Sequence, residues 1–181
     1  IRAGLSECMV LLKTNGKLPL DKPGKIAAYG SGVRRSVKGG TGSGEVNSRF
    51  NINIEEGLKQ AGFTITTEEW LEEYDKKFEL AKKPFYKHLK KEAKEAGINF
   101  LMYSMGAVMP EPEYDIALSG DGESAIYVLS RMSGEGNDRK AIAGDFLLTK
   151  TEIRDILALD RQFDKFMLVI NAGGPVDLSP V

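Results

Sequence analysis

The sequence predicts an α/β fold, a three-layer α/β/α sandwich in which helices cover both faces of a mostly parallel sheet. Short runs such as AIYVLS (125–130) are apolar on both strand faces, and these runs alternate with segments of helical periodicity. The chain has 181 residues, which is enough to bury the core of one domain. We therefore expect a single compact unit.

The first elements follow from periodicity and turn residues. Apolar residues at helical spacing across residues 5–12 predict a helix that ends at the Asn15-Gly16 turn. Cys8 occupies an apolar position of this pattern, which favours a small core residue over a nucleophile. The run KIAAYG (25–30) predicts a strand that leads into a long glycine-rich loop.

The middle of the chain predicts two helical regions around a short strand. NINIEEGLKQAG reads as a helix capped by Asn51 or Asn53 and closed by Gly62, and FTIT as the next strand. A capping box, Thr66-x-x-Glu69, then opens a long charged amphipathic segment that extends to residue 97. We expect this segment to break near Pro84.

The last third contains an irregular stretch (102–124), a buried strand (125–130), a helix opened by Thr149-x-x-Glu152 and a final strand (166–171). Three glycine-rich segments follow strands: 30–46, 131–140 and 171–179. Ligands of parallel sheets bind beyond the carboxyl ends of the strands. We therefore expect these three segments to share one rim.

Composition excludes several classes of function. The net charge is −1, with acids and bases interleaved, which argues against nucleic-acid binding. One cysteine and one histidine provide no metal-binding cluster, so neither a metal nor a cofactor is expected. No apolar run approaches the roughly 20 residues of a membrane span. The compartment is not specified, although one unpaired cysteine is compatible with a cytoplasmic protein.

Familiar glycine and serine motifs are incomplete. GSGVRRS follows a strand, but Ser36 replaces the third glycine of a dinucleotide fingerprint and more loop follows it. GGTGSGE lacks the lysine of a P-loop, and no G-x-S-x-G elbow is present. His88 lies among lysines, which is typical of a solvated helix face. A nucleotide-binding domain and a serine hydrolase are therefore disfavoured.

RMSGEGNDRK (131–140) is the most informative loop. A lone carboxylate, Glu135, stands between two glycines directly after a buried strand, and it has little packing purpose there. Glycines let a backbone approach a ligand closely, and ligand-contacting residues favour loops on rigid scaffolds. The alternative interpretation is a solvent-exposed turn in which Asp138 and Arg139 form a local ion pair.

Several segments, taken in order, resemble one known family. These are AGLSECMVLLKTNGKLPL, KIAAYGSG, KGGTGSGEVN, IEEGLKQAGF, VLSRMSGEGNDRK and LVINAGGPVDLS. Together they resemble the α/β sandwich domain of the family 3 glycoside hydrolases, the β-glucosidase family. The resemblance covers nearly the whole chain, residues 1–181, and implies a mostly parallel sheet of about six strands.

The resemblance also implies an active site shared between two domains. A (β/α)₈ barrel of the same protein would supply the aspartate nucleophile, and this chain contains no such barrel. Glu135 would be the general acid/base and Ser43 would contact the sugar of a β-glucoside or oligosaccharide substrate. The residues expected to support the Glu135 loop are Gly134, Gly136, Asp138 and Arg139.

Two hypotheses therefore stand after the sequence is read. The first is a catalytic half-site, whose isolated chain would be inactive or nearly so. The second is a non-catalytic carbohydrate-binding or interdomain scaffold module, in which SGEG is only a turn. A module of that kind would need a sugar groove with stacking aromatics, and few aromatics lie near these loops, the nearest being Phe50 and Phe146. The half-site is therefore favoured.

Overall fold

A computed structural model describes residues 4, 7–41, 48–134 and 138–181 of the chain. The elements in chain order are β1 (Lys25–Tyr29), α1 (Ile54–Gln60), β2 (Thr64–Ile65), α2 (Glu68–Glu95), α3 (Phe100–Ser104), β3 (Ser124–Arg131), α4 (Lys150–Gln162) and β4 (Lys165–Ala172).

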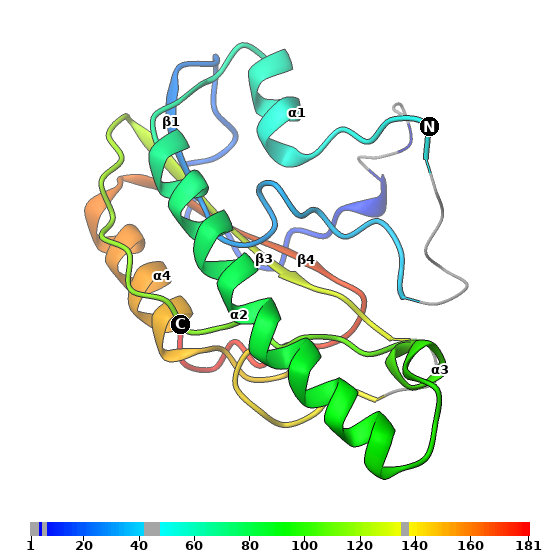
Figure 1. Cartoon of the computed structure of the whole chain (residues 1–181). Coiled ribbons are helices and arrows are strands. Elements are labelled where there is room, and N and C mark those ends of the chain that lie inside the picture. The colour runs from blue at the N-terminus through cyan, green and yellow to red at the C-terminus, as the bar shows by residue number, and fades with distance from the viewer. Residues whose placement is uncertain (1–3, 5–6, 42–47, 135–137) are drawn as a thin grey trace.

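The sheet is fully parallel, with strand order β2-β1-β3-β4. Helices α2 and α4 pack on one face and α1 lies toward the other (Figure 1), so the predicted α/β sandwich is confirmed. The described residues form four strands, however, and the expectation of about six is wrong.

Strand β3 is the centre of the core. All eight of its residues are buried, as the continuous apolar run predicted. Tyr127 of β3 and Tyr29 of β1 share one face of the sheet, where Trp70 contacts Tyr29 edge-on at 5.1 Å and stacks on Tyr74 at 5.5 Å. This aromatic layer fixes the first half of α2 against the sheet, since edge and offset-stacked ring pairs add to the burial of their area.

Side-chain caps fix the starts of α1 and α4. Asn53 caps α1, and Thr149 forms the predicted capping box with Glu152. The box predicted at Thr66 is wrong, because α2 begins after Thr67 without a side-chain cap. The hydroxyl of Thr66 donates instead to the carbonyl of Asp121 at 2.7 Å.

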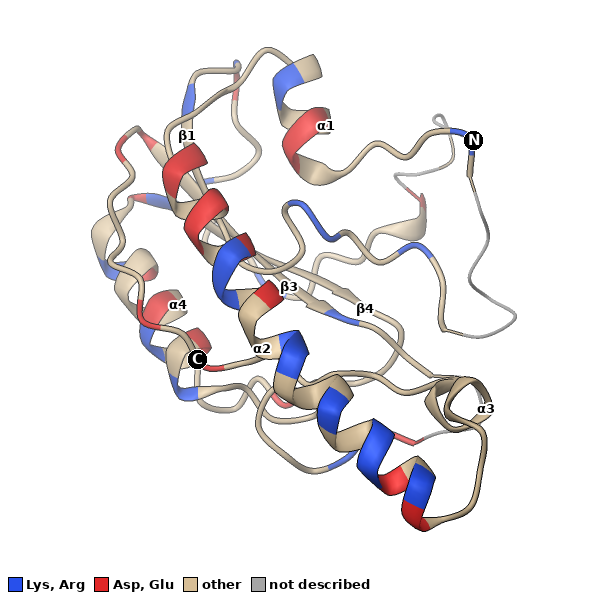
Figure 2. Ribbon diagram, viewed as in Figure 1, with Lys and Arg blue, Asp and Glu red and all other residues tan. Residues whose placement is uncertain are grey.

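Helix α2 continues through Pro84 to Glu95, so the predicted break there is wrong. Proline removes one N–H from the helix ladder. Pro84 is exposed and Leu80, whose carbonyl loses that partner, is 58% exposed, so water can satisfy the carbonyl. Figure 2 shows acids at the start of α2 and lysines along its second half, the order that the helix dipole favours. His88 lies on this exposed half, as expected.

The N-terminal segment differs most from its prediction. Residues 9–15 form no regular element, and Met9, Val10, Leu11 and Leu12 are all 73–79% exposed. Cys8 is also exposed, so its assignment to the core is wrong. Amphipathic helices gain most of their stability by packing an apolar face, and nothing in the described part of the chain covers this one. No helix in that part is long and apolar enough to cross a membrane.

Candidate functional site at the carboxyl ends of the strands

The three glycine-rich segments meet at one edge of the sheet, as predicted. The backbone N–H of Thr41 donates to the carbonyl of Ser133 at 3.0 Å. The side chain of Asn171, near the end of β4, accepts from the N–H of Val37 at 2.5 Å and donates to its carbonyl at 3.0 Å. We call this edge the carboxyl rim and define it by residues 30–41, 131–134, 138–140 and 171–174.

Glycine is required where the rim segments touch. A Cβ atom at Gly32 would lie 2.4 Å from Cγ1 of Val128, and one at Gly173 would lie 2.6 Å from Oγ of Ser133. Both distances are shorter than any real contact of that kind, so a larger residue would push the segments apart. The glycines therefore let the rim close tightly around the end of β3.

The structure describes only part of the predicted site. Ser43, Glu135 and Gly136 lie outside the described residues. Gly134 is half-buried and Asp138 is exposed on either side of that gap. Arg139 pairs with Asp145 at 2.8 Å, so the ion pair considered between Asp138 and Arg139 is not the one that Arg139 makes.

Sequence reasoning missed the charged residues that hold the end of β3. Nη2 of Arg131 lies 2.7 Å from Oε2 of Glu152, and the two side chains are 3% and 1% exposed. The same glutamate closes the capping box at Thr149. An arginine at the end of a near-continuous apolar run was the available signal, because a buried guanidinium must be paired.

A second carboxyl group, that of the half-buried Glu111, interacts electrostatically with this pair. Glu111 accepts a hydrogen bond from the hydroxyl of Tyr74. Burial, reinforced by the negative charge of Glu152, raises the pKa of Glu111 to about 8. Burial and the charge of Glu111 raise the pKa of Tyr74 as well. The raised pKa favours the neutral form of the Glu111 carboxyl group near neutral pH.

The end of β1 carries its own cluster of arginines and acids. Arg34 donates two hydrogen bonds to Glu55, of 2.6 and 3.1 Å, and one of 3.0 Å to Asp75 of α2. Arg35 pairs with Asp75 at 2.8 Å. The hydrogen bonds from Arg34 hold the pKa of Glu55 below its usual range. These pairs fix the loop after β1 to α1 and α2.

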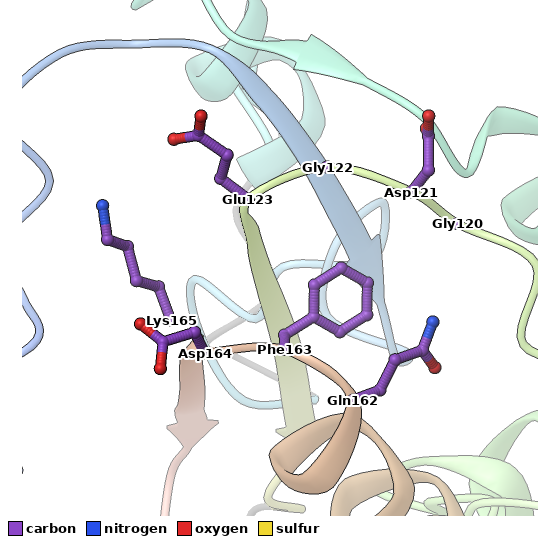
Figure 3. Close-up of a pocket in the computed structure, with 8 residues that line it drawn as sticks. All are labelled: Gly120, Asp121, Gly122, Glu123, Gln162, Phe163, Asp164 and Lys165. Carbon is purple, nitrogen blue, oxygen red and sulfur yellow. The ribbon is translucent and has the colours of Figure 1, made fainter.

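A pocket lies elsewhere on the described part of the chain. A pocket of about 530 Å³ opens where β3 and β4 begin, and it is lined by Gly120–Glu123 and Gln162–Lys165. Figure 3 shows the side chains of Glu123, Asp164 and Lys165 on one side of it. This is the end of the sheet opposite the carboxyl rim, so the pocket contains none of the predicted site residues.

Among the described residues, the rim offers polar side chains and tightly packed backbone. Among those residues, no group of three or more His, Cys, Asp and Glu side chains could hold a metal ion.

Comparison with known proteins agrees with the class that the fold defines, an α/β sandwich domain. Residues 9–181 match the glycosyl hydrolase family 3 C-terminal domain. The chain belongs to this family as its C-terminal domain.

Curated relatives and solved structures extend the match. The chain is 32% identical to β-glucosidase A of Butyrivibrio fibrisolvens, covering 94% of this chain and 22% of the relative. It is 30% identical to a β-glucosidase of Ruminococcus albus, covering 96% and 17%. The structure of β-glucosidase 3B from Thermotoga neapolitana in complex with glucose superimposes with a TM-score of 0.64 and 29% identity, over 93% of this chain and 23% of that chain. The chain thus spans about a fifth of the length of these relatives.

Proposed function

We propose that residues 1–181 form the sandwich domain of a larger retaining β-glucosidase and supply Glu135 as its general acid/base. The observation that carries this proposal is the meeting of the segments before Ser43 and Glu135, where Thr41 bonds to Ser133, in a chain of this family. Two loops that are far apart in sequence would thereby place a hydroxyl and a carboxyl group at one rim.

The chemistry needs a second domain. A retaining glycosidase uses two carboxyl groups about 5 to 5.5 Å apart, one to attack the anomeric carbon and one to protonate the leaving oxygen. We assign the nucleophile to an aspartate of a (β/α)₈ barrel outside this chain. When the barrel covers Glu135, burial and the charge of the nucleophile would raise its pKa and keep it protonated for acid catalysis.

The relatives support a terminal β-glucosyl substrate. The proteins that resemble this chain are named β-glucosidases, and one was solved with glucose. Ser43 would contact the sugar, while the barrel would contact most of its hydroxyls. Because the nucleophile lies outside the chain, the isolated domain is expected to hydrolyse glucosides poorly or not at all.

The test is Glu135→Gln in the intact protein, assayed against aryl β-glucosides whose leaving groups range from acidic to poor. Poor leaving groups need a proton from the acid and acidic ones do not. We expect kcat/KM to fall by about 10² to 10⁴ for poor leaving groups and far less for acidic ones.

Glu95→Gln is the matched control, since this glutamate lies on the exposed end of α2 and pairs only weakly with Lys91 at 3.7 Å. It should behave as wild type with every substrate. If Glu135→Gln also cleaves all substrates as well as wild type, the acid lies elsewhere. The domain would then be the non-catalytic scaffold or carbohydrate-binding module.

A further inference from the structure

Asp145 joins the two ends of the loop that carries Glu135. It lies in the connection between β3 and α4, and its side chain is 19% exposed. One carboxylate oxygen accepts from Nη1 of Arg139 at 2.8 Å and the other from the backbone N–H of Lys140 at 2.8 Å. Its carbonyl accepts from Nε of Arg131 at 2.9 Å. One residue therefore bonds to both sides of the segment 132–138.

The anchor on the β3 side is rigid. Arg131 is the last residue of the buried strand, and its guanidinium also bonds to Glu152 at the start of α4 and to the carbonyl of Ser130. Glu152 is held in turn by the capping box of that helix. Asp145 is thus attached, through Arg131, to the scaffold of the sheet.

The anchor on the far side closes the loop. Nη2 of Arg139 donates to the carbonyl of Arg131 at 3.3 Å, so the residue after the loop bonds directly to the residue before it. Gly174 of the neighbouring rim segment packs close to Arg139, where an added Cβ would lie 3.2 Å from Nε. The carboxylate of Asp145 and the carbonyl of Arg131 together orient this guanidinium, and the bond to Asp145 is the shorter of the two.

We propose that Asp145 is a positioning residue for the general acid/base, acting through Arg139 and Arg131 on the ends of the 132–138 segment. This inference rests on the proposed function of Glu135. Catalytic groups must be held close to their productive geometry, and small displacements are costly to the rate. Asp145 itself touches no reacting atom.

The test is Asp145→Asn in the intact protein, assayed with the same series of aryl β-glucosides. Asparagine keeps the shape but turns an N–H₂ group toward donors and removes the charge that orients Arg139. We expect kcat/KM to fall by about tenfold or more for poor leaving groups and by less than about threefold for acidic ones. Asp115→Asn is the control, because the Asp115 side chain is 99% exposed, and it should leave the whole series unchanged.

The double variant Asp145→Asn/Glu135→Gln separates positioning from general damage. If Asp145 acts through Glu135, its substitution should have almost no further effect once the acid is gone. An equal loss in both backgrounds, or a loss that is uniform across leaving groups, would overturn the inference while leaving Glu135 as the acid. If Glu135→Gln shows no dependence on the leaving group, the proposed function itself fails.

Arg139→Lys supplies a second variant if Asp145→Asn does not fold, as judged by circular dichroism. Lysine keeps the positive charge but cannot reach Asp145 and Arg131 with one planar fork. The same selective loss on poor leaving groups is expected, and wild-type behaviour would contradict the inference.

Discussion

Two clusters of arginines and carboxylates stand at the ends of neighbouring strands and differ in burial. The β1 cluster consists of Arg34, Arg35, Glu55 and Asp75, and the β3 cluster of Arg131, Arg139, Asp145 and Glu152. The central pair of the β1 cluster is 23% and 11% exposed, whereas that of the β3 cluster is 3% and 1% exposed.

Hydrogen-bond geometry predicts a larger contribution to folding stability from the β1 pair, whereas burial predicts a larger one from the β3 pair. Arg34 donates two hydrogen bonds to Glu55, whereas Arg131 donates one to Glu152, at 2.7 Å. If the number of hydrogen bonds decided the contribution of a pair to folding stability, the β1 pair would contribute more. Because an unpaired buried charge is far more costly than an unpaired exposed one, we expect the β3 pair to dominate. The β3 cluster also adjoins the proposed acid/base loop, where catalysis requires a fixed geometry.

The largest loss of folding stability is expected from Glu152→Ala. This change leaves the guanidinium of Arg131 buried without its charged partner and removes half of the α4 capping box. Breaking a buried pair on one side costs about 3 to 5 kcal/mol, so the urea midpoint of the chain should fall steeply. The double variant Arg131→Met/Glu152→Met should recover much of that loss, since no charge stays buried. A loss below about 1 kcal/mol for Glu152→Ala would mean that water reaches the guanidinium.

The next effect on folding stability depends on pH and concerns Glu111. The charged and titratable groups that face it are Glu152, Arg131, Arg35 and Tyr74. Its pKa is raised from 4.5 to about 8. Below pH 4.5 both the native and the unfolded chain are protonated there. Between pH 4.5 and about 8 only the native state holds the proton, so stability falls as pH rises, by up to about 1.4 kcal/mol per pH unit. Above about pH 8 the loss is complete.

Glu111→Gln removes this titration while keeping an oxygen that can accept from Tyr74. We therefore expect the variant to gain stability relative to wild type as pH rises from 5 to 8, on urea curves measured at several pH values. The gain should stop above pH 8. Parallel pH profiles for the two proteins would show that the Glu111 carboxyl group is solvated and ionised.

Local signals predicted most of the fold and the position of the rim. Strand β3 was found because it is apolar on both faces, and α4 because Thr149 and Glu152 are three residues apart. The rim followed from glycine-rich loops after parallel strands. The pairing of Arg131 with Glu152 could not be predicted, because it joins two elements whose side chains meet only after packing.

The wrong predictions of local structure have the same cause as the missed pairing of Arg131 with Glu152. Met9 and Leu12 have helical spacing, but spacing gives a helix only where an apolar surface receives it. Thr66 fits a capping box, yet its hydroxyl finds the carbonyl of Asp121 instead. Pro84 is tolerated because Leu80, whose carbonyl loses its partner, is exposed to solvent. Each outcome depended on the surroundings of a residue, which the local pattern does not contain.

The smallest loss of folding stability is expected from Glu55→Gln in the β1 cluster. The side chain of Arg34 is 23% exposed, so water can solvate the guanidinium once its partner is neutral, and we expect a loss of about 1 kcal/mol. The hydrogen bonds from Arg34 lower the pKa of Glu55. Its contribution is therefore present above the unfolded pKa and disappears as pH falls through the lowered native value. Salt should also weaken it, because screening acts on partly exposed pairs.

Urea curves of wild type and Glu55→Gln at low and high NaCl, near neutral pH and in acid, would measure these dependences. Glu95→Gln, which disturbs a pair that is 73% and 65% exposed, should change stability by less than about 0.5 kcal/mol under every condition. If Glu55→Gln instead costs as much as Glu152→Ala and resists salt, two-bond geometry outweighs burial at these strand ends. The difference between the two clusters would then lie in the fork of Arg34 and not in access to water.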